Sequence, residues 1–172
     1  MQFEPYSRRA AIGTDGYDTA QVCRNGHVRN PGIHNSPQST ERYCSDCGAA
    51  TVTQCEHCHQ SIRGTLQGVV SFGLAEAPSF CHGCGRPYPW TEQALEAART
   101  LISEEMQLEP ADQASLVAAV DELVRDTPKT QVAAMTYRRL VKRAAAGTGE
   151  VLKEALKSII AEGAKRALFG PT

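Results

Sequence analysis

The sequence predicts an α+β protein, with short β-hairpins in its N-terminal part and a bundle of about four α-helices in its C-terminal part. Two observations lead to this prediction. Six of the seven cysteines fall in C-x-x-C pairs before residue 85, between short runs of residues that favour strands. Beyond residue 90 the chain is rich in alanine, and apolar residues recur at the spacing of an amphipathic helix. We therefore expect the two parts to be stabilised in different ways.

The overall composition is that of an ordinary globular protein, with 172 residues of which 41% are hydrophobic and 22% charged. No segment approaches the ~18 consecutive apolar residues that a membrane-spanning helix requires. Ser7, Arg8 and Arg9 resemble the start of a twin-arginine export signal, but no apolar run follows them. Because free cysteines persist in a reducing compartment, the sequence predicts a cytoplasmic protein.

Four pairs of metal-ligating residues are spread over residues 23 to 84. A C-x-x-C turn brings two thiolates within reach of one metal ion, and two such pairs complete a tetrahedron. The first pair has C-x-x-x-H spacing, so that His27 supplies the eighth ligand and accounts for the odd number of cysteines. The sequence predicts two zinc ions, one held by Cys23, His27, Cys44 and Cys47 and one by Cys55, Cys58, Cys81 and Cys84.

Both zinc sites are predicted to be structural, because four protein ligands leave no open position for water or a substrate. The stretches 28–43 and 59–80 are long enough for one β-hairpin each, which gives a double zinc ribbon. Runs of strand-forming residues occur at Thr51–Thr53 and Gly68–Phe72. Only residues 48–54 separate the middle two pairs, which favours sequential ribbons, although a cross-braced pairing uses the same ligands.

The other four histidines are not expected to bind metal. His57 and His82 lie inside C-x-x-C spacers, and His34 lies in a polar loop without an evident partner. His59 stands where the other C-x-x-C pairs are followed by glycine, and it is the one spare candidate ligand.

Four helices are predicted after the last cysteine pair. The first has Thr91 as its N-cap, and the second begins near Pro110. The third follows Thr127, and the fourth runs from about Glu150 to Leu168. The predicted apolar sides carry Leu116, Val120 and Leu123 in the second helix and Val132, Met135 and Leu140 in the third. The expected division is a flexible tail over residues 1–16, a double zinc-ribbon domain over 17–90 and a helical domain over 91–172.

The helical part divides into an acidic and a basic stretch. Residues 91–126 contain nine acids and two arginines, and residues 127–172 contain nine basic residues and three acids. The two stretches are expected to pack together and partly neutralise each other. Alternatively, the third helix presents its basic residues to phosphate or to an anionic membrane. The aromatic residues of the junction between the two parts are expected to pack as a hinge, and the alternative is that they form an exposed stacking platform. The candidate binding surface comprises Tyr88, Trp90, Arg138, Arg139, Lys142 and Arg143.

Three motifs carry a resemblance to a known family. They are C-R-N-G-H from Cys23, C-H-G-C-G-R-P-Y-P-W-T from Cys81 and D-T-P-K-T-Q from Asp126. With these motifs the sequence resembles a bacterial zinc-ribbon family known only as a domain of unknown function, from about residue 17 to the last helix. The resemblance implies a bacterial, cytosolic protein of two parts, and it supplies no catalytic residue.

The sequence favours a non-enzymatic binding or adaptor protein over an enzyme. Every cysteine is used as a metal ligand, and no catalytic residue, cofactor-binding loop or small-molecule site is recognised. We expect the helical domain to dock a protein partner or to self-associate. The first alternative is nucleic-acid binding through the basic helices after residue 127, although the first 90 residues hold seven arginines against seven acids. The second alternative is association with a membrane surface through the C-terminal amphipathic helix.

Overall fold

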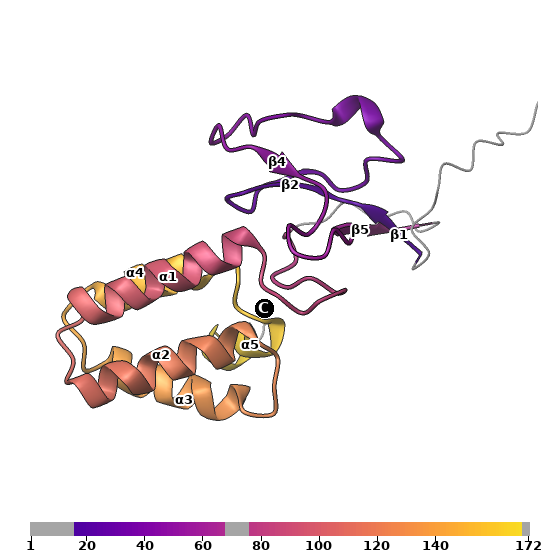
Figure 1. Ribbon diagram of the computed structural model, residues 1–172. Coiled ribbons are helices and arrows are strands. Elements are labelled where there is room, and N and C mark those ends of the chain that lie inside the picture. The colour runs from indigo at the N-terminus through magenta and orange to yellow at the C-terminus, as the bar shows by residue number, and fades with distance from the viewer. Residues whose placement is uncertain (1–15, 68–75, 170–172) are drawn as a thin grey trace, which may run out of the picture. The chain divides into compact units, whose positions relative to one another are not determined.

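The computed structural model describes residues 16–67 and 76–169, which fall into two compact units, Met1–Tyr88 and Pro89–Thr172 (Figure 1). In the described residues the first unit contains short strands and the second contains helices, which confirms the predicted α+β class. The predicted tail over residues 1–16 lies, apart from Gly16, outside the described residues, and so does the predicted strand Gly68–Phe72.

The first unit contains two small antiparallel sheets. β1 (Tyr17–Thr19) pairs with β5 (Arg63–Leu66), so that segments far apart in the sequence lie side by side. In the other sheet β2 (Gln21–Cys23) lies between β3 (Val28–Asn30) and β4 (Thr51–Val52). The position of β4 confirms the strand predicted there.

The metal-ligand pairs lie in the turns of the hairpins. β2 and β3 are joined by the turn that holds the first pair, and single antiparallel bridges flank the other three turns. The prediction of a hairpin within residues 28–43 is therefore wrong, because β3 and a short 3-10 helix, Pro37–Ser39, occupy that stretch. The physical reason is that each ligand turn reverses the chain by itself, so that the residues entering and leaving it pair with each other. The bridges join Tyr43 with Ala50, Gln54 with Ser61 and Phe80 with Pro87.

A buried carboxylate fixes the loop after β3. The Oδ1 atom of Asp18 accepts hydrogen bonds from the backbone N–H groups of Thr19 (2.6 Å) and His34 (3.2 Å). The Nδ1 atom of His34 lies 2.6 Å from the same oxygen, and the N–H of Asn35 donates to Oδ2 (3.1 Å). Burial opposes ionisation, but the hydrogen bonds from His34 and its neighbours hold the pKa of Asp18 below its usual value. Asp18 is thus the partner of His34 that the sequence did not reveal.

The second unit consists, in its described part, of five helices, one more than predicted. The helices are α1 (Pro89–Glu104), α2 (Pro110–Val124), α3 (Thr130–Val141), α4 (Thr148–Leu156) and α5 (Glu162–Phe169). α2 packs most extensively against α3, while α4 packs against α1 and α5 against α3. α1 begins at Pro89, so Thr91 lies in its first turn and is not the N-cap that was predicted.

The predicted fourth helix is interrupted between Leu156 and Glu162. The interruption allows Ile159 and Ile160, which are adjacent in the sequence, both to be buried. The N–H of Ala161 donates to the carbonyl oxygen of Leu123 at the end of α2 (3.0 Å), a bond that replaces the one inside a continuous helix. The chain can then turn, so that α5 packs against α3.

α3 turns a different side to the core from the one predicted. Its buried side chains include Ala133, Ala134 and Leu140, whereas Val132 and Met135 are 65% and 70% exposed. α3 packs against α2 and α5, and small buried residues such as alanine let a helix approach its neighbours closely. The predicted orientation of α2 is confirmed, because Leu116, Val120 and Leu123 are all buried.

Candidate metal centres

The first candidate metal centre gathers Cys23, His27, Cys44 and Cys47, whose ligand atoms all lie within 4.8 Å of one another. The Sγ atoms of Cys23 and Cys47 are 3.8 Å apart, and His27 Nδ1 lies 3.5 Å from the Sγ atoms of Cys23 and Cys44. Cys23 and Cys44 are buried, while His27 and Cys47 are exposed. The centre therefore lies at the edge of the small core, with one side open to solvent.

The second centre gathers Cys55, Cys58, Cys81 and Cys84 in the same manner, again within 4.8 Å. The Sγ atoms of Cys55 and Cys84 are 3.8 Å apart, and those of Cys58 and Cys81 are 3.6 Å apart. The structure thus joins the first ligand pair to the second and the third to the fourth. This is the sequential arrangement, and the cross-braced alternative is not formed.

The separations between ligand atoms fit a tetrahedral metal ion. An ion about 2.3 Å from each sulfur, the distance typical of zinc thiolates, places two sulfurs about 3.8 Å apart. With a metal–nitrogen distance of about 2.0 Å, the sulfur and nitrogen atoms lie about 3.5 Å apart. A disulfide would hold two sulfurs about 2.05 Å apart. The observed separations of 3.5 to 3.8 Å match the tetrahedral values, and all seven cysteines are free thiols.

The three C-x-x-C turns share one backbone geometry. In each, the first cysteine N–H donates to the carbonyl oxygen five residues later, and its own carbonyl oxygen accepts from the N–H four residues later. The residue at that fourth position has a positive φ, of 73° at Gly48, 59° at His59 and 70° at Gly85. Glycine adopts a positive φ most easily, and the other two turns have glycine at this position. In the remaining turn His59 takes the place of that glycine. His59 belongs to neither group of ligands in the described residues.

Hydrogen-bond donors surround the sulfurs of the first centre. The backbone N–H of His27 points to the Sγ of Cys23 (3.3 Å), and the side-chain amide of Asn25 donates to the Sγ of Cys47 (3.4 Å). Burial raises the pKa of Cys23, whereas the backbone N–H of Ala49 lowers the pKa of Cys47. Such donors stabilise thiolates, which are the form that binds a metal ion.

The thiols of the second centre influence one another's ionisation. Burial raises the pKa of Cys81, but the backbone N–H groups of Cys84 and Gly83 outweigh it and lower the pKa to about 6. The N–H of Gln60 lowers the pKa of Cys58, but burial and the neighbouring cysteines outweigh that and raise it to about 12. One thiolate therefore discourages the next from ionising. A divalent cation would remove this repulsion for all four sulfurs.

The two aromatic residues of the predicted binding surface are buried. Tyr88 is 2% exposed, and burial together with the negative charge of Cys81 raises its pKa. Trp90 is 6% exposed. Neither ring is available as an open stacking platform, which agrees with the expectation that both residues serve in packing.

Of the four basic residues in the predicted surface, two are engaged within the second unit. Arg138 donates to a backbone carbonyl oxygen of α5, and the Nη2 atom of Arg143 lies 2.9 Å from Oδ2 of Asp112 in α2. Arg139 and Lys142 have no ion pair in the described part of the chain. The acidic α2 and the basic α3 thus pack together, as expected, and Arg143, two residues beyond the end of α3, pairs with Asp112 of α2.

The fold and the clusters define an α+β protein with one cysteine-rich unit that could hold two metal ions and one unit of helices. The chain belongs to the family described as "Uncharacterized protein conserved in bacteria (DUF2321)", whose model matches residues 16–168 and so spans both units. No curated protein and no solved structure matches the chain. The resemblance to a bacterial family is confirmed, while the description of the family does not mention zinc.

Proposed function

We propose that this protein is a non-enzymatic binding or adaptor protein of the bacterial cytoplasm, with a zinc-held scaffold and a helical unit that docks a protein partner. The observation that carries the proposal is the solvent-facing side of α3. Val132 and Met135 are exposed there on a helix whose other side is already buried against its neighbours. One side of such a helix covers the core of its own unit, and the apolar residues on its other side can form a surface that binds a partner.

Zinc is the metal proposed for both clusters. One cluster offers three thiols and an imidazole and the other offers four thiols, and both donor sets suit tetrahedral zinc. Four protein ligands per ion complete its coordination, which supports a structural role. Elemental analysis of the purified chain should find two zinc ions per molecule. Because four thiolates also bind iron, a preparation that contains mainly iron would contradict this assignment.

The α3 docking face consists of Val132, Met135, Arg139 and Lys142, which recur at three- and four-residue spacing along one side of the helix. Arg139 and Lys142 have no ion pair among the described residues, so their charges are available to a partner. The complementary occupant is an amphipathic helix of another protein that carries apolar residues beside aspartate or glutamate. Apolar contact would supply affinity, and the opposite charges would fix the orientation.

The test compares the wild-type chain with Val132→Asp/Met135→Asp and with Val151→Asp. Val151 is 58% exposed on α4 and provides a matched control outside the face. A protein captured from a bacterial lysate and then produced in pure form should bind the wild-type chain and the control equally. It should bind the double variant roughly 10-fold or more weakly, as expected for loss of a central apolar contact. Equal binding to all three chains would refute the docking face.

Self-association is a separate outcome of the same variants. Sedimentation of the purified wild-type chain over a range of concentrations would show a dimer if a second copy occupies the face. The double variant would then be monomeric, and the helix that binds the α3 docking face would belong to a second copy of this protein.

The two alternative functions receive less support. For nucleic-acid binding by the basic helices, Arg138 and Arg143 are already engaged inside the unit. For membrane attachment, the apolar residues Leu152, Leu156 and Ile159 are buried in the helical core and so are not presented outward. In the described residues, no helix combines the length and apolar character needed to cross a membrane.

A further inference from the structure

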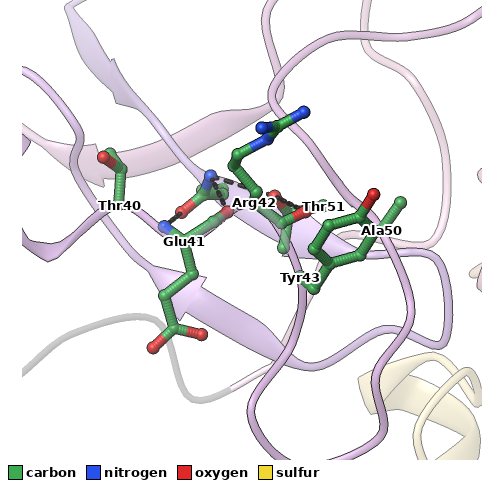
Figure 2. Close-up of a pocket in the computed structure, with 7 residues that line it drawn as sticks. Thr40, Glu41, Arg42, Tyr43, Ala50 and Thr51 are labelled. Carbon is green, nitrogen blue, oxygen red and sulfur yellow. Dashed lines mark hydrogen bonds between the residues drawn. The ribbon is translucent and has the colours of Figure 1, made fainter.

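A pocket of about 410 Å³ opens on the first unit (Figure 2). Its lining residue Tyr43 directly precedes Cys44 of the first candidate metal centre. The pocket lies where β2 and β4 meet the chain that leads into Cys44. Its lining is mostly polar and comes from three segments of the chain. The lining residues are Gln21, Thr40, Glu41, Arg42, Tyr43, Ala50 and Thr51.

The wall of the pocket is held rigidly by the sheet. The side chain of Gln21 donates to the carbonyl oxygen of Glu41 (2.8 Å) and accepts from its backbone N–H (2.9 Å). The hydroxyl of Thr51 donates to the same carbonyl oxygen (2.5 Å). Tyr43 forms an antiparallel bridge with Ala50, and the next residue is a candidate metal ligand. Residues 41–43 are therefore fixed from both sides, which reduces the entropy lost when a ligand binds.

The uncompensated charge at the pocket is positive. Its one lining acid, Glu41, accepts from Arg29 through Nε (3.0 Å) and Nη2 (3.2 Å), and this pairing lowers the pKa of Glu41. Arg42 is exposed and has no ion pair in the described part of the chain. By contrast, Arg24 and Arg29 in the same unit are paired with acids. Arg42 is thus the arginine of this pocket that is available to an anion.

An exposed aromatic ring accompanies this arginine. Tyr43 is 61% exposed, although aromatic rings of this size are usually at least half buried. Figure 2 shows the guanidinium of Arg42 and the hydroxyl of Tyr43 pointing to one side, with the carboxylate of Glu41 on the other. An aromatic ring and an unpaired guanidinium in the lining of one pocket, as with Tyr43 and Arg42, can together hold a base by stacking and its phosphate by charge.

We propose that Arg42 and Tyr43 form a nucleotide-binding site, in which the ring of Tyr43 stacks on a base and Arg42 contacts the adjacent phosphate. The ligand is a free nucleotide or a nucleotide within a single strand, since both present the same base and phosphate. A duplex is excluded as the ligand because its bases are already stacked and paired. This site lies in the first unit and is independent of the α3 docking face in the second.

The zinc-loaded full-length chain is titrated into fluorescent oligothymidylate at several salt concentrations, and separately into thymidine 5′-monophosphate and thymidine. Tyr43→Ala should weaken binding to the single strand by roughly 5- to 100-fold, the contribution of one stacked base. Arg42→Ala should weaken binding and reduce the slope of log affinity against log salt by about one. Tyr43→Phe keeps the ring and should retain binding, and thymidine should bind more weakly than its monophosphate.

The control is Arg24→Ala, which removes an exposed arginine of the same unit that is already paired with Glu56. It should bind the single strand as the wild-type chain does, and so should Val132→Asp/Met135→Asp. Zinc content is measured for every variant to show that the first unit stays folded. Wild-type affinity in Tyr43→Ala, equal affinity for duplex and single strand, or no binding to any of these probes at low salt would overturn the proposal.

Discussion

Among the described residues, the first unit buries few apolar side chains, whereas the second unit buries many. Apart from four cysteines, the buried apolar residues described in the first unit are Ala20, Val22, Ile62 and Tyr88. In the second unit every helix except α5 contributes at least two buried residues, and α5 contributes Ala164. Apolar burial is worth about 25 cal/mol per Å², so the second unit can be stable through its own core. The described core of the first unit is much smaller, and the zinc ions proposed for its two clusters would supply the missing stability.

This difference teaches where each unit is vulnerable. With the proposed zinc ions bound, the free energy of folding of the first unit would be concentrated in the eight candidate ligand side chains and in the turns that hold them. In the second unit it is distributed over many packed residues, so single exposed residues matter little. Substitutions placed in each unit can therefore test whether the two respond independently.

The largest effect is expected from removing the metal. Cys81→Ser, or treatment with a strong chelator, should unfold the first unit, because structural zinc contributes roughly 10 to 16 kcal/mol in small metal-dependent modules. Amide signals of the first unit should collapse in an NMR spectrum, while those of the second unit keep their dispersion. A zinc-depleted chain with a folded first unit would contradict the proposed role of the metal.

The corresponding experiment in the second unit is a substitution that creates a cavity in its helical core. Leu123 is fully buried in α2, and Leu123→Ala should destabilise the second unit by about 2 to 5 kcal/mol. Thermal unfolding followed by circular dichroism measures the loss, and zinc content should stay at the wild-type value. Val132→Ala on the exposed side of α3 is the control, with a change within about 0.5 kcal/mol. Loss of zinc from Leu123→Ala would show that the units do not fold independently.

A third substitution tests close packing inside the first unit. A methyl group on Gly64 would overlap the carbonyl oxygen of Pro31 and press on the backbone of Ala20. Gly64→Ala should therefore destabilise this unit by about 3 kcal/mol, because backbone atoms cannot move aside as a flexible side chain can. A zinc-competition titration would register the loss as weaker retention of both ions. A methyl group on Gly48 would meet no atom within 4 Å, so Gly48→Ala measures only the loss of stability caused by placing alanine at a positive φ.

A smaller loss is expected at the buried carboxylate. Asp18→Asn should destabilise the first unit by about 1.5 to 3 kcal/mol, since several hydrogen bonds to a charged group are weakened. The pKa of Asp18 is lowered from 3.8 by its hydrogen bonds, so its contribution is complete above that value and is lost only as the pH falls through the folded pKa. The difference from wild type, measured by denaturant unfolding with excess zinc, should stay constant between about pH 6 and pH 8. A strong pH dependence in that range would assign the effect to another group.

The smallest effect is expected at the surface of the first unit. Arg24 pairs with Glu56, and both side chains are substantially exposed. Arg24→Ala should change stability by less than about 1 kcal/mol, because solvent and salt screen such pairs. Denaturant unfolding of the zinc-loaded chain provides the measurement. A larger loss would mean that the contact between the two ligand turns contributes to holding the metal centres.

Much of the first unit follows from local chemistry. All eight ligand residues named from their spacing come together in two groups, because a C-x-x-C turn fixes its own two sulfurs and needs only one other pair. The strands were harder to predict, since each consists of two to four residues and depends on pairing partners elsewhere. Asp18 and His34 give the same lesson, because a carboxylate finds donors sixteen residues away only once β1 and the loop after β3 are folded.

In the second unit the spacing of apolar residues predicted the helices, but it did not predict for every helix which side is buried. α3 contains two overlapping apolar stripes, and only its packing against α2 and α5 selects the side with Ala133 and Ala134 over the side with Val132 and Met135. The interruption before α5 likewise depends on the carbonyl oxygen of Leu123, which lies on a different helix. Neither choice is encoded within the segment concerned.

By itself the sequence determined the α+β class, the identity of the candidate metal ligands and the contrast between a cysteine-rich and a helical part. These features follow from residue type and short-range spacing. Only the tertiary structure decided which charges and side chains stay free. Arg29 is paired and Arg42 is not, and Met135 is exposed while Leu140 is buried. The reason is physical: a side chain's availability is set by the neighbours that surround it, and those neighbours come from distant parts of the chain.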